Sequence, residues 1–361
     1  MRSYDLGDPD LDARIEQLVA DASSNPHADL VVEIVTTALK LHRDAPTRGD
    51  LKLVNTALKE MRYSMLVFSR HDEPKVTIYG SARITEDDPN YKLAEEFASV
   101  MAKREWGVIT GAGPGIMEAG SKGAGIENSY GVNIRLPFEA NANQYLLPER
   151  TVNFKYFFTR KLAFVKESHA FAIFPGGFGT LDEAYELLTL VQTGKSDMHP
   201  IVLLEAEGSG YWTRLLPAME QTLAEKGYIA PADLELFSLH HDAEAAADEL
   251  SNFYANYHSQ RYVDGNLILR LQRAPDESTL ATLNEEFSDI VVGDPMEVID
   301  ATEVERNDDD NVDLDRIAFR FNRRSFGRLR QLIDRLNELV ATPETVHPPA
   351  PMSEEQAERP W

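Results

Sequence analysis

The chain has 361 residues, 43% of them hydrophobic, which is enough for one large α/β domain with smaller additions or for two domains. Its formal net charge is −24, and such a surface repels nucleic-acid phosphates, so we expect no binding to DNA or RNA over a broad face. The chain contains no cysteine, which excludes disulfides, thiolate metal sites and cysteine nucleophiles and fits a reducing cytoplasm.

The N-terminal segment, residues 1–70, is expected to be helical. Residues 28–42 and 50–68 carry apolar residues at helical spacing, and packing or contact between subunits is their default role. The first residues lack the apolar stretch of a secretory leader, and no run of 18 apolar residues occurs. We therefore expect a cytoplasmic protein that does not insert into a membrane.

A parallel sheet is predicted next. Short apolar strands begin at Lys75, Trp106, Tyr130, His169 and Pro200. Helical patterns separate them, and this alternation is typical of a parallel sheet with right-handed crossovers. The prediction is an α/β domain over residues 71–250, a modified Rossmann fold with a central parallel sheet flanked by helices. Ligands of such sheets bind beyond the carboxyl ends of the strands.

A small α+β unit is expected over residues 251–340. Its predicted order is a strand (265–273), a helix (276–291), a strand (296–305), an acidic loop (305–315) and a strand running into a helix (314–340). Residues 341–361 contain five prolines and are expected to be disordered.

Arginines are concentrated near the end of this unit. Arg320, Arg324 and Arg328 follow the spacing i, i+4, i+8, which on a helix would form one basic stripe. The stripe would pair with acidic surface of the same or a neighbouring subunit. An anionic effector, such as a regulatory nucleotide, is the alternative.

The first glycine loop, "ITGAGPGIMEAG", follows a predicted strand and precedes a helix. Glycines allow a close approach of the backbone to a phosphate, and a helix N-terminus supplies amide donors. Ile116 replaces the third glycine of a dinucleotide fingerprint, and the next strand ends at Arg135 instead of an acidic residue, so we expect no nicotinamide site of the usual kind. The lysine and serine of a P-loop occur here in reversed order.

The second glycine loop, "FPGGFGTLDE", again joins a strand to a helix. Gly176, Gly177 and Gly179 precede Thr180, where we expect the helix to begin. Two glycine loops of the phosphate-binding type at strand ends of one sheet indicate a ligand site more strongly than either loop alone. Thr180 and Glu183 also have the spacing of a capping box, which would need no ligand, and both interpretations stay open.

These residues resemble a known family. "PGGFGTLDE" is similar to the P-G-G-x-G-T-x-x-E signature of the LOG (Lonely Guy) family of nucleoside 5′-monophosphate phosphoribohydrolases, formerly labelled lysine decarboxylases. In "FTRKLAFVKESHAFAIFPGGFGTLDE" an Arg-Lys pair precedes the loop by one helix and one strand, as in the family. "GAGPGIMEAG" and "IYGSAR" resemble its other glycine loop and its first turn. The resemblance covers residues 75–250 and points to the larger bacterial members.

The resemblance implies a set of site residues. Arg160 and Glu183 would be the catalytic pair. The substrate-binding residues would be Gly176, Gly177, Gly179 and Thr180 at the 5′-phosphate, Gly113, Gly115 and Met117 beside the nucleotide, Gly80 and Ser81 in the first turn, and Lys161 near the charged part of the ligand. Ala112, Pro114 and Glu118 depart from the family's usual first loop, which affects the expected base specificity more than the reaction.

The implied reaction suits these side chains. Cleavage of an N-glycosidic bond builds positive charge on the sugar, and a carboxylate such as Glu183 stabilises that charge and orients the attacking water. Arg160 would hold the phosphate or keep Glu183 ionised, and its alternative is a solvated helix arginine. We expect no metal and no cofactor.

The sequence therefore predicts a cytoplasmic hydrolase that converts AMP or a cytokinin riboside 5′-monophosphate to free base and ribose 5-phosphate. The resemblance also implies a homodimer or larger homo-oligomer. A non-catalytic carrier of a nucleotide or pterin-like cofactor with the same fold is the main alternative. A weaker one is an NADP-binding protein that uses Arg135. The preferred base is not predicted.

Overall fold

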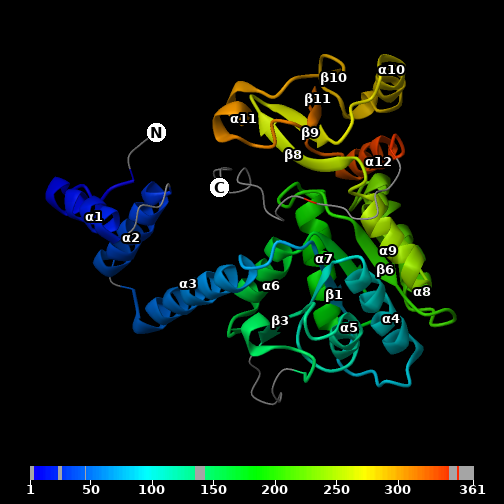
Figure 1. Ribbon diagram of the computed structural model, residues 1–361, viewed down its shortest axis with the longest axis horizontal. Coiled ribbons are helices and arrows are strands. Elements are labelled where there is room, and N and C mark those ends of the chain that lie inside the picture. The colour runs from blue at the N-terminus through cyan, green and yellow to red at the C-terminus, as the bar shows by residue number, and fades with distance from the viewer. Residues whose placement is uncertain (1–3, 23–26, 45, 135–142, 341–347, 349–361) are drawn as a thin grey trace. The chain divides into compact units, whose positions relative to one another are not determined.

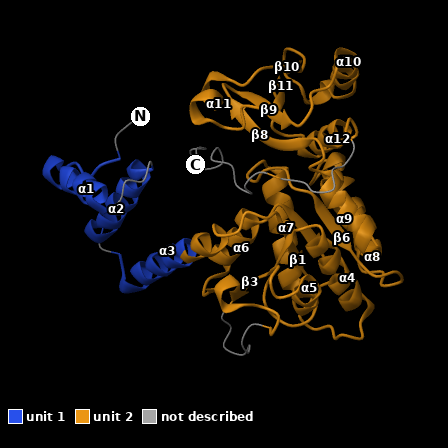
Figure 2. Cartoon of the chain, viewed as in Figure 1, with its two compact units in different colours: residues 1–62 blue, residues 63–361 orange. Residues whose placement is uncertain are grey.

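The structure is a computed structural model that describes residues 4–22, 27–44, 46–134, 143–340 and 348. The chain forms two compact units, Met1–Arg62 and Tyr63–Trp361 (Figure 2). Arg135 and the proposed disordered tail, apart from residue 348, lie outside the described residues. In the described part, no helix is long and apolar enough to cross a membrane.

The first unit is helical, as predicted. It contains α1 (Pro9–Ala22), α2 (Ala28–Arg43) and most of α3 (Arg48–Phe68). The helices α1 and α2 pack against each other, and Ile15 and Val19 are the buried residues of α1.

The second unit is built on a seven-stranded sheet with the order β4-β3-β2-β1-β5-β6-β7, in which every neighbouring pair is parallel (Figure 1). Its strands are β1 (Lys75–Tyr79), β2 (Gly107–Thr110), β3 (Ser129–Ile134), β4 (Thr151–Phe154), β5 (Ala170–Ile173), β6 (Ile201–Leu204) and β7 (Ser238–His240). Strands β1, β2, β5 and β6 are buried throughout because helices cover both faces of the sheet. The predicted α/β fold is confirmed.

The helices of this domain follow the strands. They are α4 (Pro89–Lys103), α5 (Ile116–Ala124), α6 (Phe157–Glu167), α7 (Phe178–Gln192), α8 (Trp212–Met219) and α9 (Ala243–Asn252), with short 3-10 or π segments at Pro148–Arg150, Glu220–Ala224 and Pro231–Leu236. The start of α4 illustrates the local cause: Asp88 accepts a hydrogen bond from the Asn90 amide, and Pro89 occupies the first helical position.

The strand order places a ligand crevice at β1. From β1 the chain moves outward through β2, β3 and β4 on one side, then returns to β5 on the other side. The loops that follow β1 and β5 therefore separate in opposite directions and leave an opening at the carboxyl ends of these strands. This is the edge of the sheet where the second glycine loop lies.

A second, antiparallel sheet has the order β10-β11-β9-β8. Its elements are β8 (Tyr257–Val263), β9 (Asn266–Leu271), α10 (Glu277–Glu286), a 3-10 turn (Ser288–Ile290), β10 (Glu297–Val298), α11 (Glu303–Asp308), β11 (Asp315–Phe319) and α12 (Phe326–Asn337). Whether residues 251–340 are an independent domain stays a prediction. The acidic segment predicted as a loop begins inside α11, because Thr302 and Glu305 form a capping box there.

The predicted arginine stripe is wrong. Arg320 follows β11, Arg324 precedes α12, and only Arg328 of the three lies in that helix. Helical spacing has no meaning across the turn between them. Arg328 instead forms an ion pair with Asp289, at 3.0 Å.

Candidate functional site

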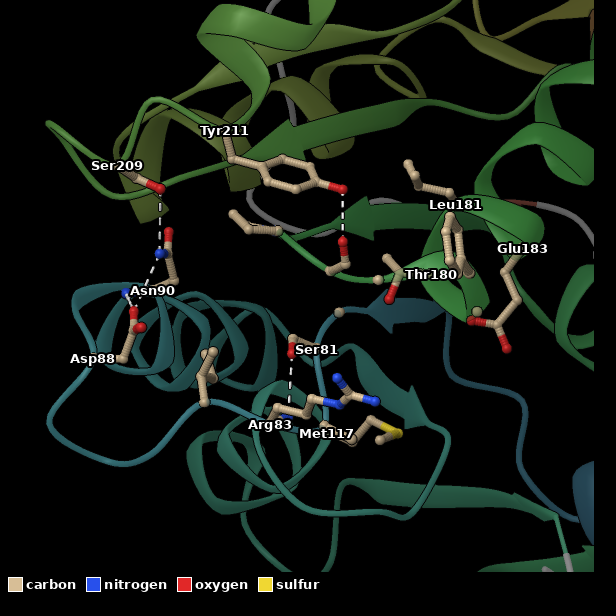
Figure 3. Close-up of a pocket in the computed structure, with 18 of the residues that line it drawn as sticks. Ser81, Arg83, Asp88, Asn90, Met117, Thr180, Leu181, Glu183, Ser209 and Tyr211 are labelled. Atoms are coloured by element: carbon tan, nitrogen blue, oxygen red, sulfur yellow. Dashed lines mark hydrogen bonds between the residues drawn. The ribbon is translucent and has the colours of Figure 1, made fainter.

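A cavity of about 1080 Å³ lies at the carboxyl ends of the central strands (Figure 3). Its walls come from the loop after β1, the start of α4, the glycine loop before α7, and the loop between β6 and α8. Met117 of α5 and Arg160 of α6 complete the lining. The cavity therefore occupies the crevice that the strand order creates.

The N-terminus of α7 faces this cavity without a cap of its own. The helix begins at Phe178 with Gly177 as N-cap residue, and no side chain accepts a hydrogen bond there. Thr180 is the third residue of the helix, so the proposed capping box of Thr180 and Glu183 is wrong. A Cβ at Gly177 or Gly179 would meet no atom within 4 Å, so the space beside the free amides is open. These amides and the helix dipole favour an anion.

Two of the other helices that begin at the cavity, α4 and α8, are already capped. Asp88 caps α4, and the buried Glu205 carboxylate accepts hydrogen bonds from the Tyr211, Trp212 and Thr213 amides at the start of α8. Their first-turn donors are thus satisfied by the chain itself. The start of α7 is the better place for an anionic ligand.

Arg160 and Glu183 meet in the cavity wall. Arg160 Nη1 lies 3.4 Å from Glu183 Oε1, and its Nε donates a hydrogen bond to the Val132 carbonyl at 2.9 Å. Only 9% of the Arg160 side chain and 15% of the Glu183 side chain is exposed, so Arg160 is not a solvated helix arginine. Burial raises the pKa of Glu183 to about 7, against the opposing effect of the Arg160 guanidinium.

Lys161 points elsewhere. Its ammonium pairs with Asp182 at 2.8 Å and Glu186 at 3.3 Å on the neighbouring α7, and Lys161 is not among the described residues that line the cavity. Asp182 and Glu183 therefore face different partners, because adjacent helical residues diverge by 100°.

The turn after β1 packs tightly against the glycine loop. The Ser81 amide donates to the Pro175 carbonyl at 3.0 Å, and both Gly80 and Ser81 line the cavity. A Cβ at Gly80 would lie 2.5 Å from Ile116 Cγ2, so only glycine allows α5 to approach this turn.

The first glycine loop packs behind the turn after β1, and most of it lies outside the cavity lining. Gly113 and Gly115 do not line the cavity, whereas Met117 does. Gly115 has φ of 69°, and a Cβ there would lie 2.3 Å from the Ser81 carbonyl oxygen. A glycine is therefore required at position 115 for the close packing of this loop against the turn after β1.

The glycine loop before α7 contacts Thr180 and Tyr211 through Gly176. A Cβ at Gly176 would lie 2.2 Å from Thr180 Oγ1. The Tyr211 hydroxyl donates to the Gly176 carbonyl at 2.7 Å, as Figure 3 shows. The predicted residues that line the cavity are Gly80, Ser81, Met117, Arg160, Gly176, Gly177, Gly179, Thr180 and Glu183.

Sequence reasoning missed several polar residues of the same cavity. They are Arg83, Asp88, Asn90, Ser209, Tyr211 and Arg214. Arg83 is the last residue of the recognised "IYGSAR" segment, of which only Gly80 and Ser81 were predicted to bind the substrate. The others carry no motif, and the rule that loops after parallel strands line the crevice is the signal that points to them. In the described part of the chain, no group of three or more His, Cys, Asp or Glu could hold a metal ion.

Residues 111–250 match the model of the family described as "Possible lysine decarboxylase". The probable cytokinin riboside 5′-monophosphate phosphoribohydrolase LOGL3 of Oryza sativa subsp. japonica is 34% identical over 28% of this chain and 46% of its own length. The pyrimidine/purine nucleotide 5′-monophosphate nucleosidase of Escherichia coli strain K12 is 30% identical over 39% of this chain and 33% of its own length. The solved molybdenum cofactor binding protein from Rippkaea orientalis is 20% identical, with 49% of this chain and 94% of that chain covered and a TM-score of 0.35.

The family match and the names of the curated relatives confirm the resemblance to the LOG family that the signature predicts. The chain spans less than half the length of either curated relative.

Proposed function

Because residues 111–250 match the LOG family, we propose that this protein hydrolyses the N-glycosidic bond of nucleoside 5′-monophosphates. The proposed substrates are AMP and cytokinin riboside 5′-monophosphates, and the products are the free base and ribose 5-phosphate. The single observation that carries the proposal is the pairing of Arg160 with Glu183 inside a cavity that also receives the uncapped start of α7.

The cavity suggests how the substrate would bind. The 5′-phosphate would accept hydrogen bonds from the free amides of the glycine loop and from the Thr180 hydroxyl. With the phosphate at the start of α7, the sugar reaches Glu183, which lies one helical turn further along. Met117 also lines the cavity and offers an apolar, adaptable contact for a base.

The chemistry requires ionised Glu183. As the C1′–N bond breaks, its electron pair leaves with the base, and positive charge develops on the sugar. The Glu183 carboxylate stabilises that charge and accepts a proton from the water that attacks C1′. A pKa of about 7 leaves roughly half of the groups ionised at neutral pH, and Arg160 favours the ionised form.

We also propose that the protein is a homo-oligomer. Helices α6 and α7 expose large apolar side chains, including Phe157 at 54% and Phe158 at 53%. Exposed aromatic residues of this size are common where a second protein covers them. Sedimentation at several protein concentrations tests this, and a monomer at all of them would exclude it.

The test of the proposed activity is direct. Purified protein is incubated at pH 8 with AMP, GMP, CMP, UMP or isopentenyl-AMP, and free bases are separated by chromatography. We expect the wild type and a Glu186→Gln control on the same helix to release base, and Glu183→Gln to lose about 10²–10⁴ of the rate. Nucleotide binding without base release from any substrate would support the carrier alternative instead.

A further inference from the structure

Two arginines of the cavity have no part in the catalytic pair. The cavity is lined by three arginines, of which Arg160 is held by Glu183 and by the Val132 carbonyl. Among the residues that the structure describes, Arg83 and Arg214 have no carboxylate within ion-pair distance.

Arg83 and Arg214 reach the cavity from separate elements. Arg83 lies in the turn after β1, where its amide donates to Ser81 Oγ at 3.1 Å, and Figure 3 shows its side chain directed into the cavity on the side opposite Thr180. Arg214 belongs to the first turn of α8, and its side chain folds against Gly210, where an added Cβ would lie 3.2 Å from Nε. Both side chains line the cavity that the glycine loop also lines.

The ionisable side chains that line the cavity leave it with an excess of positive charge. Its two carboxylates are Asp88 and Glu183, the first of which caps α4 while the second pairs with Arg160. Three arginines and two carboxylates give the cavity lining a formal charge of +1, in a chain whose net charge is −24. A phosphate monoester carries about −1.5 to −2 at pH 7, so its charge matches that of the two guanidinium groups. Guanidinium groups also bind phosphate oxygens bidentately.

We propose that Arg83 and Arg214 form the cationic half of the phosphate subsite, opposite the amides of the glycine loop, and that they restrict the substrate to nucleotides that carry a 5′-phosphate. The proposal rests on the proposed function for the identity of the substrate. It assigns a specificity role to two residues outside the P-G-G-x-G-T-x-x-E signature, of which Arg83 ends the "IYGSAR" segment and Arg214 lies in no recognised motif. A nucleoside without the phosphate would leave both positive charges without an anion and would gain nothing from them.

The experiment compares Arg83→Ala, Arg214→Ala and the conservative Arg83→Lys with the wild type. Arg320→Ala is the matched control because it removes an exposed arginine of the same compact unit that does not line the cavity. A charge-assisted hydrogen bond contributes about 1.5–3 kcal/mol, which is about 10–150-fold in binding. We expect KM for AMP to rise by this factor in each alanine variant. The value of kcat should change by less than about threefold, because the arginines would bind the phosphate equally well in the ground state and in the transition state.

Binding is also measured without turnover. Calorimetric titration with ribose 5-phosphate, and with ribose as its uncharged counterpart, reports the phosphate subsite alone. We expect the wild type and Arg320→Ala to bind ribose 5-phosphate, the alanine variants to lose at least tenfold in affinity, and Arg83→Lys to retain part of it. Unfolding midpoints measured in parallel should be equal, since neither side chain has an ion-pair partner to lose.

The outcomes separate this inference from the proposed function. If AMP is hydrolysed and both alanine variants keep the wild-type KM and affinity for ribose 5-phosphate, the inference is overturned and the activity stands. If no base is released, but ribose 5-phosphate binds and the variants lose that binding, the subsite stands and the activity fails. A wild type that does not distinguish ribose 5-phosphate from ribose would overturn the subsite.

Discussion

Replacing Glu183 with glutamine should change how the stability of the folded protein depends on pH, so that the variant gains stability relative to the wild type as the pH rises from 4.5 to 8. Glutamine has the shape of the protonated carboxyl group and never acquires its charge. In the wild type, burial raises the pKa of Glu183 from 4.5 to about 7. Its side chain is only 15% exposed, so solvent screens the shift little.

The magnitude follows from proton linkage. Between pH 4.5 and about 7 the unfolded chain has lost the proton at Glu183 while the folded chain keeps it, so stability falls as the pH rises. Each unit of pKa shift corresponds to about 1.36 kcal/mol, which gives about 3 kcal/mol for this carboxyl group. The free energy of unfolding of Glu183→Gln, relative to the wild type, should therefore increase by about 3 kcal/mol from pH 4.5 to pH 8.

Urea unfolding of both proteins across this pH range measures the difference. Trp106 and Trp212 are buried in the second compact unit and report its unfolding by fluorescence. Glu186→Gln is the control, because its carboxylate is 38% exposed and pairs with Lys161 outside the cavity. A stability difference between Glu183→Gln and wild type that does not change with pH would refute the reasoning that burial controls this group.

Three further substitutions have defined outcomes. Tyr211→Phe removes the hydroxyl that donates a hydrogen bond to the Gly176 carbonyl. Losing about 1 kcal/mol of binding free energy with this hydrogen bond should raise KM for AMP about fivefold, and an unchanged KM would show that the hydroxyl does not position the glycine loop. Gly176→Ala would place a Cβ 2.2 Å from Thr180 Oγ1, so the loop must shift. Calorimetry should therefore show that this variant binds ribose 5-phosphate more weakly than the wild type does. Glu305→Gln removes the buried carboxylate that pairs with Arg270 at 2.8 Å and with Arg316 at 3.2 Å, and should lower the free energy of unfolding by about 3–5 kcal/mol; a loss below 1 kcal/mol in urea unfolding would contradict this.

Much of the central fold could be predicted because its strands are long apolar runs between amphipathic helices. The five predicted strands correspond to β1, β2, β3, β5 and β6. Strand β4 was missed because it has four residues and runs almost directly into α6, so its apolar residues continue the helical pattern. The half-buried β7 has only three residues, and β8 has polar residues at four consecutive positions, 258–261, so neither shows an apolar run.

The candidate site could be predicted where local sequence determines geometry. A glycine loop between a strand and a helix must lie at the carboxyl end of the sheet, and the position of Glu183 one turn into α7 follows from it. The start of that helix could not be located to the residue, which is why a capping box of Thr180 and Glu183 stayed open as an alternative to ligand binding. Arg83 and Arg214 are 131 positions apart, and only the strand order brings their loops to one cavity. No local pattern encodes that convergence.

The pH dependence of base release from saturating AMP tests the central claim most directly. If ionised Glu183 carries the reaction, kcat for the wild type should rise about tenfold per pH unit below its pKa of about 7 and level off at higher pH. The phosphate group of the substrate titrates near pH 6 and is already ionised where most of this rise occurs. A rate that is constant from pH 6 to pH 9, or no release of adenine at any pH, would contradict the assignment of Glu183 and the hydrolase that depends on it.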